Sequence, residues 1–275
     1  PADCARVGGG FSGWRLALEQ DAEQLAAVLA RIHAASAVAV LVIPQLQEGA
    51  YGYTGARQLL DERLTTSHVL DIGGGSLQIA GERSAWGEML GQKAWHRRLC
   101  QEIRNSESAP CELQPMTGAE LATARSLLAE LLGGVAAALP GPVTLTAISR
   151  PVSRSVAPAV ARLVPAGAGA DVLQRPAISA AIGRIAGLTS SETMVATATS
   201  RDHVAYLLST MLLVEGVLLA TGSESLQVAE IDLTNLPGLL ADDRAFAWGQ
   251  RYGCYLARLH TLGLGAYASD PATCP

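Results

Sequence analysis

The residues best suited to chemistry lie in one run, Val69 to Ala80, which reads VLDIGGGSLQIA. Asp71 ends an apolar stretch, where a carboxylate can hold a hydrated Mg²⁺. The glycines Gly73–Gly75 can adopt positive φ and can expose bare backbone N–H groups to an anion. Ser76 offers a hydroxyl to a phosphate oxygen. Apolar residues on both sides predict two strands joined by a tight hairpin. The turn is either a phosphate-binding loop or an ordinary glycine hairpin capped by an aspartate.

A second acid, Glu48, follows a predicted buried strand over Val38 to Ile43 and precedes the small residues Gly49 and Ala50. A strand end places side chains at the edge of a sheet, where α/β proteins bind ligands. We therefore expect Glu48 to lie in a cleft and to face the Gly73–Ser76 loop. The alternative is that Glu48 lies in the first turn of a helix, where the helix dipole stabilises a carboxylate.

Together, the runs EGAYGY from Glu48 and LDIGGGS from Leu70 resemble two groups of actin-like phosphohydrolases. The second run is similar to the phosphate loop of the exopolyphosphatase and guanosine pentaphosphate phosphatase family. The first run, with the segment around Gln78, is similar to the apyrases. The resemblance implies that Glu48 is the catalytic base that orients the attacking water. It also implies that Asp71 binds Mg²⁺, the cofactor.

The same resemblance implies an α/β, actin-like (ribonuclease H-like) fold of two domains around an interdomain cleft. Residues 1–66 with 243–275 would form an abbreviated first domain, because the chain has no room for one strand–helix–strand segment of the family. Residues 67–242 would form the second domain. The expected substrate is polyphosphate or a nucleoside polyphosphate, and the sequence does not choose between polyphosphate and a guanosine pentaphosphate-type substrate.

The segment Arg6 to Leu18 stands where these families carry their first phosphate loop, and its glycines predict another hairpin. Aligning Arg15 with that loop's usual arginine puts Gly8 in place of the usual aspartate and Phe11 in place of the usual serine. The first loop is therefore expected to be degenerate.

Ser12 can partly replace the missing hydroxyl, and Asp3 is the one nearby acid that can replace the missing carboxylate. The residues expected to contact phosphate are Gly10, Ser12, Gly73, Gly74, Gly75 and Ser76.

The remaining patterns predict alternating helices and strands. Helices are predicted over Asp21–His33, Gly49–Leu60, Thr117–Leu139, Ile178–Leu188, Val204–Ala220 and Asp242–Leu262, and strands over Val143–Ile148 and Leu226–Ile231. The helix over Val204–Ala220 is apolar but short for a membrane span and is interpreted as a buried core helix. Between these elements, the loop Ser149–Ser155 carries Arg150 and Arg154, and it is either a divergent anion site or a surface loop.

Composition excludes some classes of function. The formal net charge is −5 and no basic cluster stands out, so no nucleic-acid partner is expected. No membrane partner and no signal peptide are expected either, and a homodimer is possible. The five cysteines form no metal-ligand pattern, and we interpret them as free thiols in a reducing compartment, the cytoplasm. A single lysine among abundant alanine and leucine is typical of a GC-rich bacterial genome.

Two functions from different classes follow. In the first, the protein is a phosphoanhydride hydrolase in which Glu48 orients water and Asp71 positions Mg²⁺. In the second, the fold persists as a phosphate- or nucleotide-sensing or partner-binding module with hydrolysis lost. A carboxylate that fills the place of the missing first-loop acid would distinguish them in favour of the enzyme.

Overall fold

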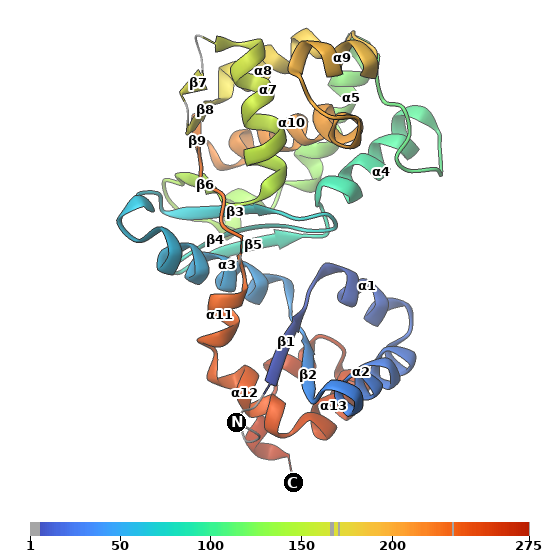
Figure 1. The fold of residues 1–275 in the computed structure, drawn as a ribbon, viewed down its shortest axis with the longest axis vertical. Coiled ribbons are helices and arrows are strands. Elements are labelled where there is room, and N and C mark those ends of the chain that lie inside the picture. Colours follow the sequence, from blue (N-terminus) through green and yellow to red (C-terminus); the bar gives the residue numbers. More distant parts are fainter. Residues whose placement is uncertain (1–5, 166–167, 170, 233, 275) are drawn as a thin grey trace. The chain divides into compact units, whose positions relative to one another are not determined.

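The computed structural model describes residues 6–165, 168–169, 171–232 and 234–274 (Figure 1). The chain divides into two compact units. Residues 59–232 form one, here called the central unit, and residues 1–58 with 233–275 form the other, the terminal unit. The predicted domain boundaries, after residue 66 and before residue 243, stay a prediction.

The central unit is built on a mixed sheet of seven strands in the order β5-β4-β3-β6-β9-β8-β7. Three strands in its middle, β3, β6 and β9, run parallel, and the outer pairs are antiparallel. The strands are β3 His68–Ile72, β4 Leu77–Gly81, β5 Ala85–Glu88, β6 Leu145–Ala147, β7 Ala168–Gly169, β8 Val172–Gln174 and β9 Ser225–Val228. This arrangement brings the ends of β3, β6 and β9 to one edge of the sheet.

Helices cover this sheet and bury its apolar side chains. They are α4 Gln92–Arg104, α5 Gly118–Leu131, α6 Val135–Ala138, α7 Ala157–Leu163, α8 Arg175–Ile185, α9 Ser190–Thr197 and α10 Arg201–Thr221. A capping box starts α5, because Thr117 and Glu120 bond to each other's backbone there. The core interpretation of α10 is confirmed, since its central residues are buried within the unit.

Two segments are long and apolar enough to cross a membrane by length and composition, Gly118–Ala138 and Arg201–Thr221. In the second segment 67% of the most apolar window is buried inside the protein, and in the first 28%. Buried core helices of other proteins meet the same two criteria.

The terminal unit has a parallel pair of strands, β1 Arg6–Gly10 and β2 Val38–Val42. Its helices are α1 Ser12–Gln20, α2 Ala22–Ser36, α3 Gln45–Leu60, α11 Leu236–Leu240, α12 Asp243–Gln250, α13 Tyr252–Leu262 and α14 Gly265–Ala268. Its core joins residues from both ends of the chain, among them Leu29, Leu41, Trp248 and Tyr255, all fully buried. Asp21 is the N-cap of α2, since its side chain accepts a hydrogen bond from the Gln24 N–H.

The hairpin predicted over Arg6 to Leu18 is wrong. Residues Arg6–Gly10 form one strand parallel to β2, and the chain turns directly into α1 at Ser12. The glycines serve packing instead of a turn: a Cβ at Gly9 would lie 2.7 Å from the Phe11 ring, and one at Gly10 would lie 2.9 Å from the Trp14 ring. The single helix predicted over Asp242–Leu262 is also two helices, which meet at Arg251.

The prediction of five free thiols is wrong for four of them. Cys100 and Cys111 form a disulfide in the central unit, and Cys254 and Cys274 form one in the terminal unit. The Cα atoms are 5.8 Å and 6.1 Å apart, distances that permit a disulfide. In each pair the first cysteine lies on a helix, and the chain after that helix folds back and brings the second cysteine beside it. The spacing of the cysteines in the sequence does not predict this contact. Cys4 lies outside the described residues.

Candidate functional site

The glycine loop is a hairpin turn between β3 and β4, as predicted. Ile72 pairs with Leu77 across the ladder, and the Gly73 N–H donates to the Ser76 carbonyl at 2.9 Å. The loop carbonyls point at the start of α4: Gly73 O accepts from the Gln92 N–H, and Gly74 O accepts from the N–H groups of the next two residues, at 2.8–3.2 Å. The loop therefore satisfies donors in the first turn of α4.

The next three backbone N–H groups of the loop, those of Gly74, Gly75 and Ser76, donate no hydrogen bond to any other described residue. Successive backbone N–H groups with no internal partner can bind an anion, and the phosphate contacts of this loop stay a prediction. The chain does not use positive φ to build it, contrary to expectation, because the glycines with positive φ in the described residues are Gly141, Gly222 and Gly263.

The glycine loop also requires Gly91, which the sequence analysis missed. A Cβ at this position would lie 2.5 Å from Ser76 N and 2.6 Å from Gly73 O, so a side chain would displace the loop backbone. Gly91 is the N-cap of α4. A glycine one residue before a helix, shortly after a glycine loop, was the available signal.

Ser76 places its hydroxyl at the base of the loop. The side chain is 1% exposed, and its Oγ accepts a hydrogen bond from Gln78 Nε2 at 2.9 Å. The hydroxyl accepts this bond and keeps its own proton, which it can donate.

Asp71 lies on β3, opposite Gln78 in the ladder, and is half-buried. Among the described residues, it belongs to no group of three or more metal-ligating side chains. Mg²⁺ is commonly held by one or two carboxylates together with waters and substrate phosphates. A single carboxylate beside an anion site fits this minimal role. The assignment of Mg²⁺ to Asp71 stays a prediction.

Glu48 lies in the first turn of α3, which is the alternative that the sequence left open. Glu48 is 6% exposed, and its Oε2 lies 2.7 Å from Nη2 of Arg15, which is 2% exposed. Burial raises the pKa of Glu48 above its ordinary value, and the Arg15 guanidinium opposes that rise. The predicted approach of Glu48 to the glycine loop joins the two units and stays a prediction.

Arg15 is held at the start of α1 by more than Glu48. Its Nη1 donates to the Ile43 carbonyl at 2.9 Å. Its Nε is buried and has no hydrogen-bond partner among the described residues. Gly10 ends β1 and Ser12 begins α1, so the predicted first phosphate loop is a strand-to-helix junction. Asp3, the suggested replacement acid, lies outside the described residues.

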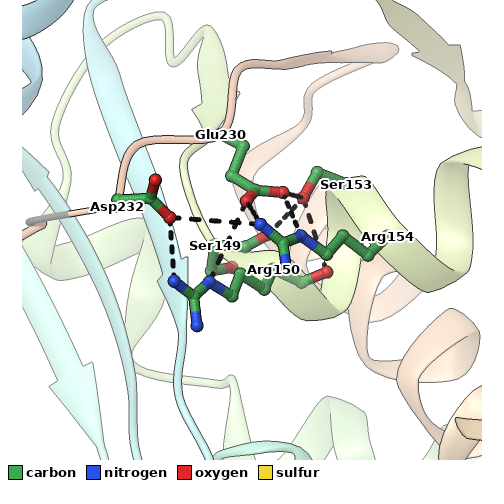
Figure 2. Close-up of polar contacts among 6 residues, drawn as sticks. All are labelled: Ser149, Arg150, Ser153, Arg154, Glu230 and Asp232. Atoms are coloured by element: carbon green, nitrogen blue, oxygen red, sulfur yellow. Dashed lines mark hydrogen bonds and ion pairs between the residues drawn. The ribbon is translucent and has the colours of Figure 1, made fainter.

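The segment Ser149–Ser155 after β6, here called the arginine segment, is helical from Arg150 onward, with a π-helical turn over Val152–Val156, and is not the loop that we expected. Acids neutralise its two arginines (Figure 2). Glu230 accepts from Arg154 Nε at 2.9 Å and from Ser153 Oγ at 2.6 Å, and Asp232 lies 2.8 Å from Arg150 Nη2. The arginine side chains are more than half exposed. These contacts favour a network of surface ion pairs over an anion site, on a helical segment and not on a surface loop. Ser149 reaches the sheet, where its Oγ accepts from the Ile72 N–H at 3.1 Å, just before the glycine loop.

Comparison with solved structures identifies the fold. A Ppx/GppA family member from Aquifex aeolicus superposes with a TM-score of 0.60 and 18% identity, over 79% of this chain and 68% of that chain. An exopolyphosphatase-like protein gives a TM-score of 0.62 and 17% identity, over 92% and 77%. An exopolyphosphatase from Cytophaga hutchinsonii gives 0.59 and 17%, over 85% and 73%.

No protein-family model and no curated protein matches the sequence. The solved structures alone show that the chain has the α/β, actin-like fold of the Ppx/GppA exopolyphosphatase structures, and this confirms the predicted fold class.

Proposed function

We propose that the protein binds the terminal phosphates of polyphosphate or of a nucleoside polyphosphate and hydrolyses the terminal phosphoanhydride slowly. One observation carries the proposal: the successive N–H groups of Gly74, Gly75 and Ser76 have no partner among the described residues. Phosphate oxygens accept hydrogen bonds from successive backbone amides of this kind. Lys93, the single lysine of the chain, places its stem beside the loop, 3.7 Å from where a Gly74 Cβ would lie, and is exposed. Its charge would favour an anion there.

In this proposal Glu48 orients the attacking water. A buried carboxylate with a raised pKa is a stronger base than an exposed one, and Arg15 fixes its direction. When bound, Mg²⁺ would neutralise charge on the transferring phosphoryl group. Asp71 would hold the ion through water and phosphate oxygens. The Ser76 hydroxyl donates to a phosphate oxygen.

Hydrolysis is expected to be slow because the alignment of Arg15 with the usual arginine of the first phosphate loop leaves that loop degenerate. Phe11 and Gly8 supply neither a hydroxyl nor a carboxylate at the positions where the resembled families carry them. The loss of one preorganised donor or charge typically costs about 10²–10³-fold in rate.

A second candidate function is phosphate binding without hydrolysis. The observation that favours it is the Arg15–Glu48 ion pair, since a carboxylate that is engaged by a guanidinium is less available to orient water. Binding by the glycine loop does not depend on that pair.

One experiment tests both functions. Phosphate release with Mg²⁺ is measured across polyphosphate and nucleoside polyphosphates, and binding of the same compounds is measured by calorimetry. Gly74 is exposed and its Cβ position meets only Lys93, so Gly74→Asn is a neutral control for Gly74→Asp, which adds a repelling charge.

Binding that Gly74→Asp weakens at least about tenfold more than Gly74→Asn supports the loop as the site. Release of phosphate in addition supports the hydrolase, and binding alone supports the second candidate. Equal effects of the two substitutions, or no binding of any compound, would overturn the proposal.

A further inference from the structure

A second cluster of reactive side chains lies on α4 and the loop after it, away from the glycine loop. His96 and Cys100 are on successive turns of α4, and Cys111 comes from the loop that leads toward α5. One ligand atom of each residue lies within 4.8 Å of the other two. Among the described residues, this is the one group of three or more histidine, cysteine and acidic side chains that could hold a metal ion.

We propose that reduction of the Cys100–Cys111 disulfide converts this cluster into a binding site for one Zn²⁺, held by two thiolates and one imidazole nitrogen. Zn²⁺ prefers sulfur and imidazole ligands at about 2.3 Å and 2.0 Å, which places neighbouring ligand atoms roughly 3.5 Å apart in a tetrahedron. The three donors need only small movements to reach that spacing. The proposal does not depend on the function of the glycine loop.

The side chains differ in how freely they can move. Cys100 and His96 are fully buried and fixed on a helix, whereas Cys111 is half-buried in irregular chain. After reduction, the Cys111 sulfur can turn away from Cys100 by rotation about its own side-chain bonds. Water can reach the half-buried side and take the fourth zinc position.

The surroundings favour the ligand forms of these groups. The Cys111 N–H lies 3.2 Å from the Cys100 sulfur, and a backbone donor stabilises a thiolate. The imidazole of His96 is fully buried on α4, and an imidazole coordinates a metal in its neutral form. The two ring nitrogens lie 3.2 Å from Ser209 Oγ and 3.2 Å from the Cys111 carbonyl. When one nitrogen binds zinc, the partner of the other fixes the ring, as in known zinc sites.

The chemistry balances with an external thiol or phosphine as reductant. Two electrons and two protons pass to the disulfide and give two thiols. A thiol reductant supplies both and becomes a disulfide, whereas a phosphine supplies the electrons, and one water supplies the two protons and the oxygen of the phosphine oxide. Zn²⁺ then displaces the two thiol protons, which pass to solvent.

The other disulfide provides an internal control. Cys254 and Cys274 are joined in the terminal unit, and no described histidine or acid forms a metal group with them. The two reduced pairs should therefore respond differently to zinc although both supply two thiols.

The test uses the full chain with Cys4→Ser, so that the fifth thiol does not contribute. Protein reduced by a phosphine and freed of metal is titrated with Zn²⁺ and then alkylated with iodoacetamide, and mass spectrometry locates the alkylated cysteines. We expect one tightly bound Zn²⁺ per reduced chain and none per oxidised chain. Zinc should protect Cys100 and Cys111, while Cys254 and Cys274 stay reactive. Equal protection of both pairs, or protection of neither, would overturn the proposal.

Substitutions test which side chains bind zinc, and one variant controls for effects of cysteine removal on the fold. His96→Gln should weaken zinc binding by about tenfold or more, since even the partners of a zinc-bound histidine have effects of this size. Cys254→Ser with Cys274→Ser should leave it unchanged. Co²⁺ in place of Zn²⁺ should give a thiolate charge-transfer band in the reduced protein, and the band should disappear in Cys111→Ser. Unchanged zinc affinity in His96→Gln would remove the histidine from the site.

Discussion

Arg15 and Glu48 form a buried ion pair between the start of α1 and the first turn of α3, with Nη2 of the arginine 2.7 Å from Oε2 of the glutamate. The residues are far apart in sequence, and the parallel pairing of β1 with β2 brings their helices to the same end of the small sheet. This pair is where the two proposed functions differ. The carboxylate of a catalytic base must remain accessible to water, whereas a carboxylate in a structural ion pair need not.

Glu48→Gln keeps the shape of the side chain and removes the base. If Glu48 orients water, turnover should fall by about 10²-fold or more while substrate affinity stays nearly constant. The measurement is phosphate release at saturating substrate, with calorimetric binding as the control for a folded site. Unchanged turnover would remove the catalytic role of Glu48.

The same residue should impose a pH dependence on stability. Burial raises the pKa of folded Glu48 above its ordinary value near 4.5, so the folded state holds the proton more tightly than the unfolded state. The stability contributed by Glu48 is therefore fully present below about pH 4.5 and is lost as the pH rises through the raised pKa. Denaturation with urea at a series of pH values checks this. Glu48→Gln should remove that component, and identical pH profiles for both proteins would contradict it.

Gly91→Ala tests whether the start of α4 holds the glycine loop in place. The added methyl would lie 2.5 Å from Ser76 N, so the loop backbone must move, at a cost of about 1–3 kcal/mol. We expect lower stability in urea and weaker anion binding in calorimetry.

Gly183→Ala is the matched control for that substitution. Gly183 is inside α8, nothing lies within 4 Å of its Cβ position, and the change should stabilise the protein by about 0.5–1 kcal/mol. Anion binding as strong in Gly91→Ala as in Gly183→Ala would show that the loop does not depend on Gly91.

Local signals in the sequence predicted those parts of the fold whose causes are local. The β3–β4 hairpin follows from a glycine run between apolar stretches, and the starts of α2 and α5 follow from Asp21 and from Thr117 with Glu120. The glycines of β1 look the same in sequence but provide room for Phe11 and Trp14. That difference depends on packing and could not be predicted from a turn signal.

The candidate site was predicted in its residue types but not in its contacts. Gly91 packs against the backbone of Ser76, and Arg15 forms an ion pair with Glu48. Both contacts join residues of different elements, and residue spacing in the sequence does not predict them. The two disulfides also depend on how loops return to helices. Sequence reasoning therefore found the loop and missed what supports it.

Mg²⁺ should bind weakly to the protein alone. Asp71 is the one predicted ligand, and a single carboxylate holds the ion mostly through water. Calorimetry with Mg²⁺ alone should show little heat of binding, and addition of a non-hydrolysable nucleoside polyphosphate should strengthen it. Tight binding of Mg²⁺ without any phosphate compound would show that a further acid completes the site, which would also contradict the alignment of Gly8 with the missing aspartate.

The last prediction concerns Arg150 and Arg154 in the arginine segment after β6. If Arg150 and Arg154 formed an anion site, their removal would weaken polyphosphate binding as strongly as Gly74→Asp does. Glu230 and Asp232 already neutralise both guanidinium groups, and the side chains are more than half exposed to screening by salt (Figure 2).

We therefore expect Arg150→Ala with Arg154→Ala to leave the affinity for polyphosphate within about twofold of the wild type. Glu230→Gln is the matched test, because it removes the acid that engages Arg154 at two nitrogens and keeps the arginines in place. Glu230→Gln could strengthen polyphosphate binding, and the double arginine substitution could abolish that gain. The arginine segment would then be an anion site that Glu230 and Asp232 normally occupy. If neither variant changes the affinity, measured by calorimetry across a series of salt concentrations, the arginine segment is a network of surface ion pairs and polyphosphate binds at the Gly74–Ser76 amides.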